Sequence, residues 1–320
     1  MKIGFYIKYP KFSIERPGNV LGEEILANSL CEGLRKLGGV EQVEVYAPNY
    51  LPEEELDAMV YLDCPLNRKW ARKHYLYWQY SYDNNVDYRE MLHDYHELDY
   101  DGYMFFSDHL LELHEAAGQT GILLPFGVDT ESFIPQPVST EFNHEVAYLG
   151  SYIKGKEITD RYLIPCLKFD FGLYGNWNPA YYRFRYWRNW PWLLPSRRRY
   201  MNISKGKLPQ EKVPILYSSA KININFSSEA ANRWNVISFR TYEVLACKGF
   251  LISDKNDYIE KELAGKVVFS EGGNDLRDKI EYYLAHEDER RRIAEAGYEY
   301  VQKKGSIYKR AEKLLGYISE

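Results

Sequence analysis

The feature that most constrains the fold of this chain is a regular alternation of short apolar runs with amphipathic segments. In the first third, leucine and isoleucine residues recur at helical spacing over 21–37, and Gly38 and Gly39 end that run. Runs of 3 to 6 residues rich in apolar, β-branched and aromatic types, typical of strands, lie at 3–7, 43–47, 59–62, 75–80, 103–106 and near 122–124. Strands alternating with helices predict a parallel sheet covered by helices on both faces.

The alternation stops between 126 and 142 and then starts again. That interval contains Pro135 and Pro137 and has little periodicity, so we expect a hinge there. In the second half, the pattern predicts strands at 146–149, 169–174, 222–226, 250–253 and 267–269, and helices at 156–167, 209–219, 237–247, 274–285 and 287–303.

These patterns predict an α/β protein with two Rossmann-like, doubly wound domains that face a cleft. We expect an N-terminal domain over 1–134, a C-terminal domain over 135–303, and a tail helix over 304–320. In doubly wound folds the ligand binds outside the carboxyl ends of the strands. Fold alone does not distinguish an enzyme from a binding protein.

Composition narrows the protein class. Hydrophobic residues make up 45% and charged residues 27% of the 320 residues, which is typical of a globular chain. Apolar runs are too short for a transmembrane helix, and the N-terminal run is too interrupted for a signal peptide. The four cysteines form no Cys-x-x-Cys pair, so we expect a cytoplasmic protein without disulfides.

Charge is concentrated in one segment, 176–207, which we call the basic aromatic block. It carries eight Lys and Arg residues, no acidic residue and four of the seven Trp residues, although the chain as a whole carries a net charge of −5. Three interpretations stay open: a packed structural excursion, an anchor at the inner face of a membrane, and a platform for an acceptor. The acidic net charge argues against a nucleic-acid partner.

Several motifs are absent. The sequence has no Gly-x-Gly-x-x-Gly after its first strand, no phosphate-binding P-loop and no Gly-x-Ser-x-Gly elbow. The histidine pairs, 93 with 96 and 109 with 114, lack a third ligand at a recognisable spacing. We therefore predict no bound metal and no resident cofactor.

The loop before the first helix contains Gly18, Asn19 and Gly22. Glycines at a helix N-terminus let an anion approach main-chain N–H groups, where the helix dipole favours negative charge. An ordinary glycine turn explains the same residues equally well.

Residues 221–254 form the most informative stretch, because a strand, a polar loop, a helix and a second strand follow in order. Arg240 and Glu243 lie three positions apart at the start of that helix. An arginine can clamp a diphosphate and a carboxylate can hold a vicinal diol. An intrahelical surface ion pair is the alternative.

Several segments together resemble the CgeB-like, spore maturation protein type of glycosyltransferase, within the GT-B superfamily. In the second half these are Tyr148-Leu-Gly-Ser151, Leu173-Tyr-Gly-Asn-Trp177, and the segments 216–225, 238–254 and 292–297. In the first half, 124–133 resembles the segment that leads into the second domain of such enzymes, whereas 1–120 resembles them only in pattern.

The resemblance assigns roles to residues of the C-terminal domain. It implies that Glu243 holds the ribose of a nucleotide-sugar donor and that Arg240 faces the diphosphate. Gly150 and Lys154 resemble the strand-end loop that cradles donor phosphate. Asn235 stands where the broader retaining family has a second glutamate, so the resemblance does not decide between inversion and retention.

We therefore expect a metal-independent glycosyltransferase that moves a sugar from a nucleotide-activated donor to a glycan, a lipid-linked molecule or another acceptor. Asp83, in a loop of the N-terminal domain, and Glu23, at the head of its first helix, are candidate catalytic bases for an inverting reaction. Two alternatives stay open: a non-catalytic two-lobed binding protein, and an isomerase of nucleotide-sugars or sugar phosphates.

Overall fold

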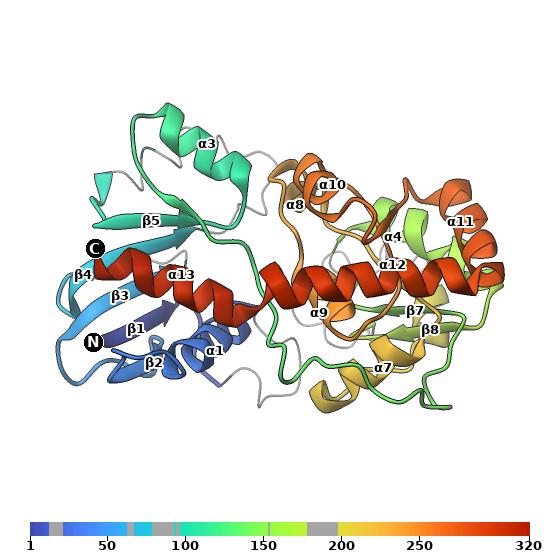
Figure 1. Ribbon diagram of the computed structural model, residues 1–320, viewed down its shortest axis with the longest axis horizontal. Helices are drawn as coiled ribbons and strands as arrows, with labels where there is room; N and C mark the ends of the chain where they lie inside the picture. The colour runs from blue at the N-terminus through green and yellow to red at the C-terminus, as the bar shows by residue number, and fades with distance from the viewer. Residues whose placement is uncertain (13–21, 63–66, 79–92, 94–96, 153, 178–197) are drawn as a thin grey trace. The chain divides into compact units, whose positions relative to one another are not determined.

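The chain forms two compact units, which Figure 1 shows in a computed structural model. The structure describes residues 1–12, 22–62, 67–78, 93, 97–152, 154–177 and 198–320. The first unit comprises Met1–Asp129, Glu229–Ile237 and Lys304–Glu320, and the second comprises Thr130–Ser228 and Ser238–Lys303. The division after Asp129 lies close to the expected hinge. Two excursions into the first unit, Glu229–Ile237 and the C-terminal tail, differ from the expected linear order.

The first unit is built on a six-stranded sheet in which every pairing is parallel, as the alternation predicted. The strand order is β2-β1-β3-β4-β5-β6. The strands are β1 (Lys2–Ile7), β2 (Gln42–Tyr46), β3 (Leu56–Leu62), β4 (Ala71–Trp78), β5 (Gly102–Phe105) and β6 (Ile122–Leu123). Its helices are α1 (Gly22–Arg35), α3 (Asp108–Ala116), the short α8 (Glu229–Arg233) and α13 (Ile307–Ser319).

Helix α13 packs against α1, so the tail is part of the first unit rather than a separate body. Ser306 caps α13 by accepting a hydrogen bond from the N–H of Tyr308. A Cβ on Gly33 would lie 2.8 Å from the Cβ of Ala311, so the glycine is what allows the two helices to approach. The buried residues of α13 recur at helical spacing: Ile307, Ala311, Leu314 and Ile318.

The second unit contains a five-stranded, wholly parallel sheet with the order β11-β10-β9-β7-β8. Its strands are β7 (Val146–Leu149), β8 (Phe171–Tyr174), β9 (Ile222–Asn225), β10 (Leu251–Ser253) and β11 (Val268–Phe269). Its helical elements are α4 (Lys156–Leu163), η1 (Pro165–Lys168), η3 (Gln210–Lys212), α7 (Val213–Ser219), α9 (Phe239–Ala246), α10 (Asp257–Leu263), α11 (Gly273–Ala285) and α12 (Glu287–Tyr300), and η4 (Val301–Gly305) leads back to the first unit.

Aromatic rings fill much of the core of the second unit. The ring of Phe226 stacks on Tyr148 and on Tyr162, with 5.0 Å between ring centres in both cases. Trp177 and Tyr200, at the two ends of the basic aromatic block, are buried in the same core. The ends of the block are therefore anchored in the fold.

The interior of the block lies outside the described residues, and with it lie Trp187, Trp190, Trp192 and Arg197. All four of its described cations are exposed: Arg198, Arg199, Lys205 and Lys207. No helix in the part of the chain that the structure describes is long and apolar enough to cross a membrane. The three interpretations of the block stay open.

Two helices were not predicted, and one ends early. Helices α8 and α10 span 5 and 7 residues, too few to show a clear helical period. The helix expected over 156–167 stops at Leu163, and a 3-10 turn begins at Pro165, which has no N–H to continue the α-helical hydrogen bonds.

Candidate functional site

The sheet of the second unit has a topological switch point between β7 and β9. From β7 the chain first adds β8 on one side and later adds β9 on the other. Helices that follow strands on opposite sides of such a point diverge, which leaves a crevice outside the carboxyl ends of the strands. The residues that follow β7, β9 and β10 therefore define the candidate site.

Two glycines shape the loop after β7. The N–H of Gly150 donates to the carbonyl of Tyr174, with 2.9 Å between the atoms, so the loops after β7 and β8 meet there. A Cβ on Gly175, where φ is 127°, would overlap the carbonyl of Gly150. A Cβ on Gly150 would lie 2.6 Å from the hydroxyl of Tyr148. Both positions require the close approach that only glycine permits.

Lys154 reaches from this loop to the end of β9. Its ammonium donates to the carbonyl of Phe226 and lies 4.3 Å from the centre of the Phe226 ring and 5.6 Å from that of Tyr148. None of the carboxylates in the described residues lies within 4.0 Å of it. Its amino group thus contacts a carbonyl and two aromatic faces, the surroundings that also attract a cation.

Asp254 supplies the buried carboxylate of the site. It follows β10 and is 3% exposed. Its Oδ2 accepts the N–H of Ser227 at 2.7 Å, and its Oδ1 accepts the hydroxyl of Ser253 at 3.1 Å. These bonds join the carboxyl ends of β9 and β10.

Three buried polar atoms at these strand ends have no hydrogen-bond partner among the described residues: the hydroxyls of Tyr148 and Ser227 and the Oδ1 of Asn225. The three side chains are between 1% and 4% exposed. Buried polar atoms are nearly always paired, so three unpaired atoms at one edge are candidates for hydrogen bonds to a polar ligand.

Helix α9 adds Arg240 and Glu243. The amide nitrogen of Asn225 donates to the hydroxyls of Ser238 and Thr241, at 2.8 and 3.2 Å, and so fixes the start of α9 at the end of β9. Glu243 accepts a hydrogen bond from the hydroxyl of Tyr217 at 3.3 Å. In the described structure no ion pair joins Arg240 to Glu243, so the intrahelical surface pair is not formed.

The electrostatics of the site couple these side chains. Burial and the nearby Arg240 hold the pKa of Lys154 well below its usual value, and Asp254 opposes this. Burial also raises the pKa of Glu243, while Arg240 and the Tyr217 hydroxyl counteract it. Both shifts disfavour a charged form, the ammonium of Lys154 and the carboxylate of Glu243. An anionic ligand would stabilise the ammonium, and a ligand with hydroxyl groups would stabilise the carboxylate.

The structure brings four of the predicted binding residues, Gly150, Lys154, Arg240 and Glu243, to the carboxyl edge of one unit. Gly18, Asn19 and the candidate base Asp83 lie outside the described residues. The other candidate base, Glu23, is half-buried in the first turn of α1 in the first unit. The roles of all these residues stay predictions.

Asn235 belongs to the first unit, not to the unit that holds Glu243. Its backbone is left-handed, with φ of 55°, and its amide nitrogen lies 3.4 Å from Oδ1 of Asp108 at the start of α3. The neighbouring Trp234 ring lies 5.7 Å from that of His109. Asn235 is therefore assigned to a different unit from Gly150, Lys154, Arg240 and Glu243.

Sequence reasoning missed Asp254, Ser227 and Tyr148 as members of this site. One signal could have indicated Asp254: it is a carboxylate that directly follows a buried apolar strand, 250–253. Ser227 and Tyr148 give no such signal, because only the order of the strands brings them to the same edge.

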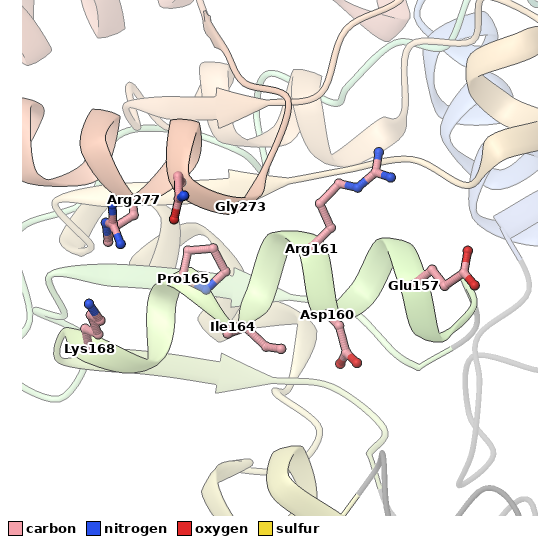
Figure 2. Close-up of a pocket in the computed structure, with 9 residues that line it drawn as sticks. Glu157, Asp160, Arg161, Ile164, Pro165, Lys168, Gly273 and Arg277 are labelled. Carbon is pink, nitrogen blue, oxygen red and sulfur yellow. The ribbon is translucent and has the colours of Figure 1, made fainter.

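A separate hollow of about 360 Å³ lies in the helical layer of the second unit, between α4, η1 and α11 (Figure 2). Figure 2 shows Lys168 and Arg277 at one end of it and Glu157 at the other. None of the predicted site residues lines it. Among the described residues, no group of three His, Cys, Asp or Glu side chains could hold a metal ion.

Comparison with known proteins connects this geometry to a protein family. Residues 159–316, just under half of the chain, match the family described as "Glycosyl transferase-like". No curated protein sequence matches the chain. Similar solved structures span almost the whole length of the chain, although their sequences are only distantly similar.

One is a sucrose-phosphate synthase from Thermosynechococcus elongatus, with a TM-score of 0.71 and 13% identity over 99% of this chain and 98% of that one. Another is a glycosyltransferase from Rickettsia africae, with a TM-score of 0.68 and 15% identity over 99% and 97%. HepE from Anabaena, solved with UDP and glucose, has a TM-score of 0.66 and 12% identity over the full length of both chains.

Residues 159–316 therefore match the glycosyl transferase-like family model, and the chain has the fold of GT-B glycosyltransferases. This confirms the expected fold class and the broader part of the resemblance. The narrower CgeB-like assignment stays a prediction.

Proposed function

We propose that the chain is a metal-independent glycosyltransferase whose nucleotide-sugar donor binds at the carboxyl edge of the second sheet. The observation that carries this proposal is the convergence of Lys154, Arg240 and Glu243 at the switch point, beside three buried polar atoms without described partners. A nucleoside diphosphate combines the features that this edge complements: negative charge, oxygen acceptors and a ribose diol.

The two cations would bind the diphosphate. As the bond between sugar and phosphate breaks, negative charge develops on the leaving phosphate, and fixed cations and hydrogen-bond donors that face it lower the barrier. Lys154 and Arg240 are those cations in our proposal, and the hydroxyls of Tyr148 and Ser227 are additional donors. Because they supply the charge stabilisation, the reaction proceeds without a divalent metal.

Glu243 would hold the ribose. Each carboxylate oxygen can accept a hydrogen bond from one hydroxyl of a vicinal diol, and charge-assisted bonds of this kind are stronger than neutral ones. The carboxyl group of Glu243, which has a raised pKa and one hydrogen bond from Tyr217 in the free protein, gains two further donors when the diol arrives. Binding therefore stabilises the ionised form.

The acceptor would bind to loops of the first unit. If the configuration of the sugar is inverted, a base must take the proton of the acceptor hydroxyl, and we propose Glu23 or Asp83 for that step. If the configuration is retained, the leaving phosphate takes the proton and no protein base is needed.

The donor in this proposal is a UDP-hexose, because HepE was solved with UDP and glucose. Membership of the CgeB-like subgroup, with a glycan or a lipid-linked molecule as acceptor and a position at the inner face of the membrane, is part of the same proposal. It rests on the quoted segments and on the basic aromatic block.

Thermal shift and donor hydrolysis test the proposal together. The purified protein is heated with UDP, GDP, dTDP and UMP, and then incubated with UDP-glucose, GDP-mannose and dTDP-glucose. We expect one nucleoside diphosphate to raise the melting temperature and its sugar conjugate to be hydrolysed slowly. Binding without any turnover would favour a binding protein, and a rearranged sugar without hydrolysis would favour an isomerase.

A further inference from the structure

Two loops of the first unit leave the carboxyl edge of its sheet side by side. They are 8–12, after β1, and 47–51, after β2, and the register of the two strands places Tyr6 opposite Tyr46. The main-chain N–H of Lys11 donates to Oδ1 of Asn49 at 2.8 Å, which joins the loops. Residues 47 and 50 close the second loop through reciprocal main-chain hydrogen bonds of 2.9 Å.

These loops expose large hydrophobic side chains. Of the nine large hydrophobic side chains that are exposed in the described residues, four lie here: Tyr9, Phe12, Tyr50 and Leu51, which we call the loop patch. Each is between 42% and 47% exposed. A concentration of this kind at the ligand-binding edge of a sheet indicates contact with a ligand or partner.

Lys11 organises the patch from beneath. It is 8% exposed, and its ammonium lies 4.0 Å from the centre of the Tyr50 ring and 5.4 Å from that of Phe12. Glu44 binds the same ammonium at 2.7 Å and neutralises it. Tyr50 also stacks on the buried Tyr46, with 16° between the ring planes. Both exposed rings are therefore held in place, and the cation that holds them is compensated.

The backbone at Phe12 is strained. Its φ is 74°, a left-handed conformation that a bulky residue rarely adopts and that glycine adopts freely. The N–H of Phe12 donates to Oε1 of Glu24 at 2.6 Å, and Glu24 is 2% exposed. A buried carboxylate thus holds an exposed aromatic side chain in an unfavourable backbone conformation, an arrangement typical of functional positions.

We propose that the loop patch is an acceptor subsite that binds a neutral sugar ring, so that the acceptor is a glycan. This inference rests on the proposed function and names the chemistry of its acceptor. The C–H groups on one face of a pyranose carry partial positive charge and pack against the negative face of an aromatic ring. Phe12 and Tyr50 provide two such rings around one cation.

Charge decides between a sugar and other occupants. A membrane anchor combines exposed aromatic residues with several uncompensated cations. The two described loops contain two cations: Lys11 is buried and paired with Glu44, and Lys8 is a single exposed residue. An uncharged ligand that offers flat C–H faces and hydroxyl groups matches rings of this kind.

A glycan array with neutral, sialylated and sulfated glycans tests the inference on the full-length protein without a donor. We expect binding to a subset of neutral glycans, weakened about five- to ten-fold by Tyr50→Leu, as removal of one stacking ring predicts. Tyr282→Leu is the matched control, because Tyr282 is 47% exposed on α11 in the other unit. Tyr50→Trp should keep the binding.

Phe12→Gly separates function from stability. Since glycine relieves the left-handed strain, this variant should melt at a higher temperature than the parent and yet bind the same glycans more weakly. UDP binding, measured by thermal shift, should be equal in all variants, so a failure of the donor site is seen independently of this subsite.

The inference is overturned if neutral glycans do not bind, if Tyr50→Leu leaves their binding unchanged, or if only charged glycans bind. Binding of the parent, but not of Tyr50→Leu, to vesicles of phosphatidylcholine and phosphatidylglycerol would assign the patch to a membrane and would also overturn it.

Discussion

The ammonium of Lys154 donates a hydrogen bond to the main-chain carbonyl of Phe226 and lies 4.3 Å from the centre of that residue's ring. The side chain thus spans the switch point, from the loop after β7 to the end of β9. Its surroundings disfavour the charged form, because burial and Arg240 both lower the pKa of Lys154, and Asp254 only partly restores it.

We therefore expect nucleotide binding to be coupled to protonation of Lys154. The lowered pKa means that, between that value and the usual 10.5, the folded protein holds the amine neutral while the unfolded chain holds it charged. Stability contributed by this group rises with pH across the window. A diphosphate raises the pKa again, so binding takes up a proton and the affinity falls as pH rises through the same window.

Calorimetry of UDP binding at a series of pH values below 10.5, in buffers of different ionisation enthalpy, measures this uptake. Up to about one proton per site is expected for the parent protein. Lys154→Arg should abolish the uptake, since arginine stays protonated. The matched control is Lys156→Arg, at an exposed lysine two positions away that pairs with Asp160. Equal uptake in the parent and in Lys154→Arg would contradict the prediction.

Glu243→Ala should weaken the binding of the preferred nucleotide. Loss of each charge-assisted hydrogen bond to the ribose is expected to cost about 1.5–3 kcal/mol of binding free energy. The protein should stay folded, because the described structure shows only the hydroxyl of Tyr217 bound to this carboxyl group. Calorimetric titration gives the change, and Glu260→Ala, at an exposed position of the same unit, is the control. An unchanged affinity in a folded variant would remove Glu243 from the site.

Metal independence can be tested directly. Donor turnover should continue at the same rate in EDTA as in Mg²⁺ or Mn²⁺, because in our proposal Lys154 and Arg240 supply the positive charge at the leaving phosphate. The rate of nucleotide release is the measurement. Complete loss in EDTA, restored by a divalent metal, would show that a metal carries that charge instead.

Changing Arg197, Arg198 and Arg199 together to Ala tests the basic aromatic block. Nucleotide binding should stay intact, while acceptor use or binding to anionic vesicles should weaken. Each basic residue near an anionic surface contributes about 1 kcal/mol, and salt should reduce the effect with a screening length of about 8 Å at physiological ionic strength. Vesicle co-sedimentation and acceptor kinetics at two salt concentrations measure it. If the melting temperature falls while vesicle binding and acceptor kinetics are unchanged, the block has only a structural role.

How much the sequence predicts depends on how local the determinant is. The apolar runs of the strands and the helical spacing of apolar residues in α1, α11 and α12 are local features of the sequence. Their alternation predicted both parallel sheets. Helix α8, of 5 residues, shows no such period. The segment Glu229–Ile237, which contains α8 and Asn235, belongs to the first unit. Nothing in the spacing of Asn235 and Glu243 reveals that they belong to different units.

The same reasoning explains the site. Lys154, Arg240 and Glu243 were predicted because they lie in segments that resemble a family. Asp254 and Ser227 meet only because β10 pairs with β9. The positions of the two residues in the sequence do not reveal which strands are neighbours in the sheet. Phe12 is a position where the residue type alone predicts the wrong backbone conformation. Phenylalanine favours a negative φ, but Phe12 has a positive φ, and its N–H is bound by the carboxylate of Glu24, twelve positions away.

The amino end of the second sheet offers a test of packing that is independent of function. His144 is 9% exposed, and its ring lies between the carboxylate of Asp170, at 3.2 Å, and the hydroxyl of Tyr174, at 3.0 Å. A Cβ on Gly172, in β8, would overlap the Cδ2 of this ring. The imidazole cannot move away without breaking at least one of its two hydrogen bonds.

Gly172→Ala should therefore destabilise the protein by about 1–3 kcal/mol, the usual range when an extra methyl group is forced into a packed site. Urea denaturation followed by circular dichroism measures the free energy of unfolding. Gly38→Ala is the matched control, since a Cβ there would meet nothing within 4 Å. If both variants unfold at the same urea concentration as the parent, the ring of His144 is not held between Asp170 and Tyr174 as the structure describes.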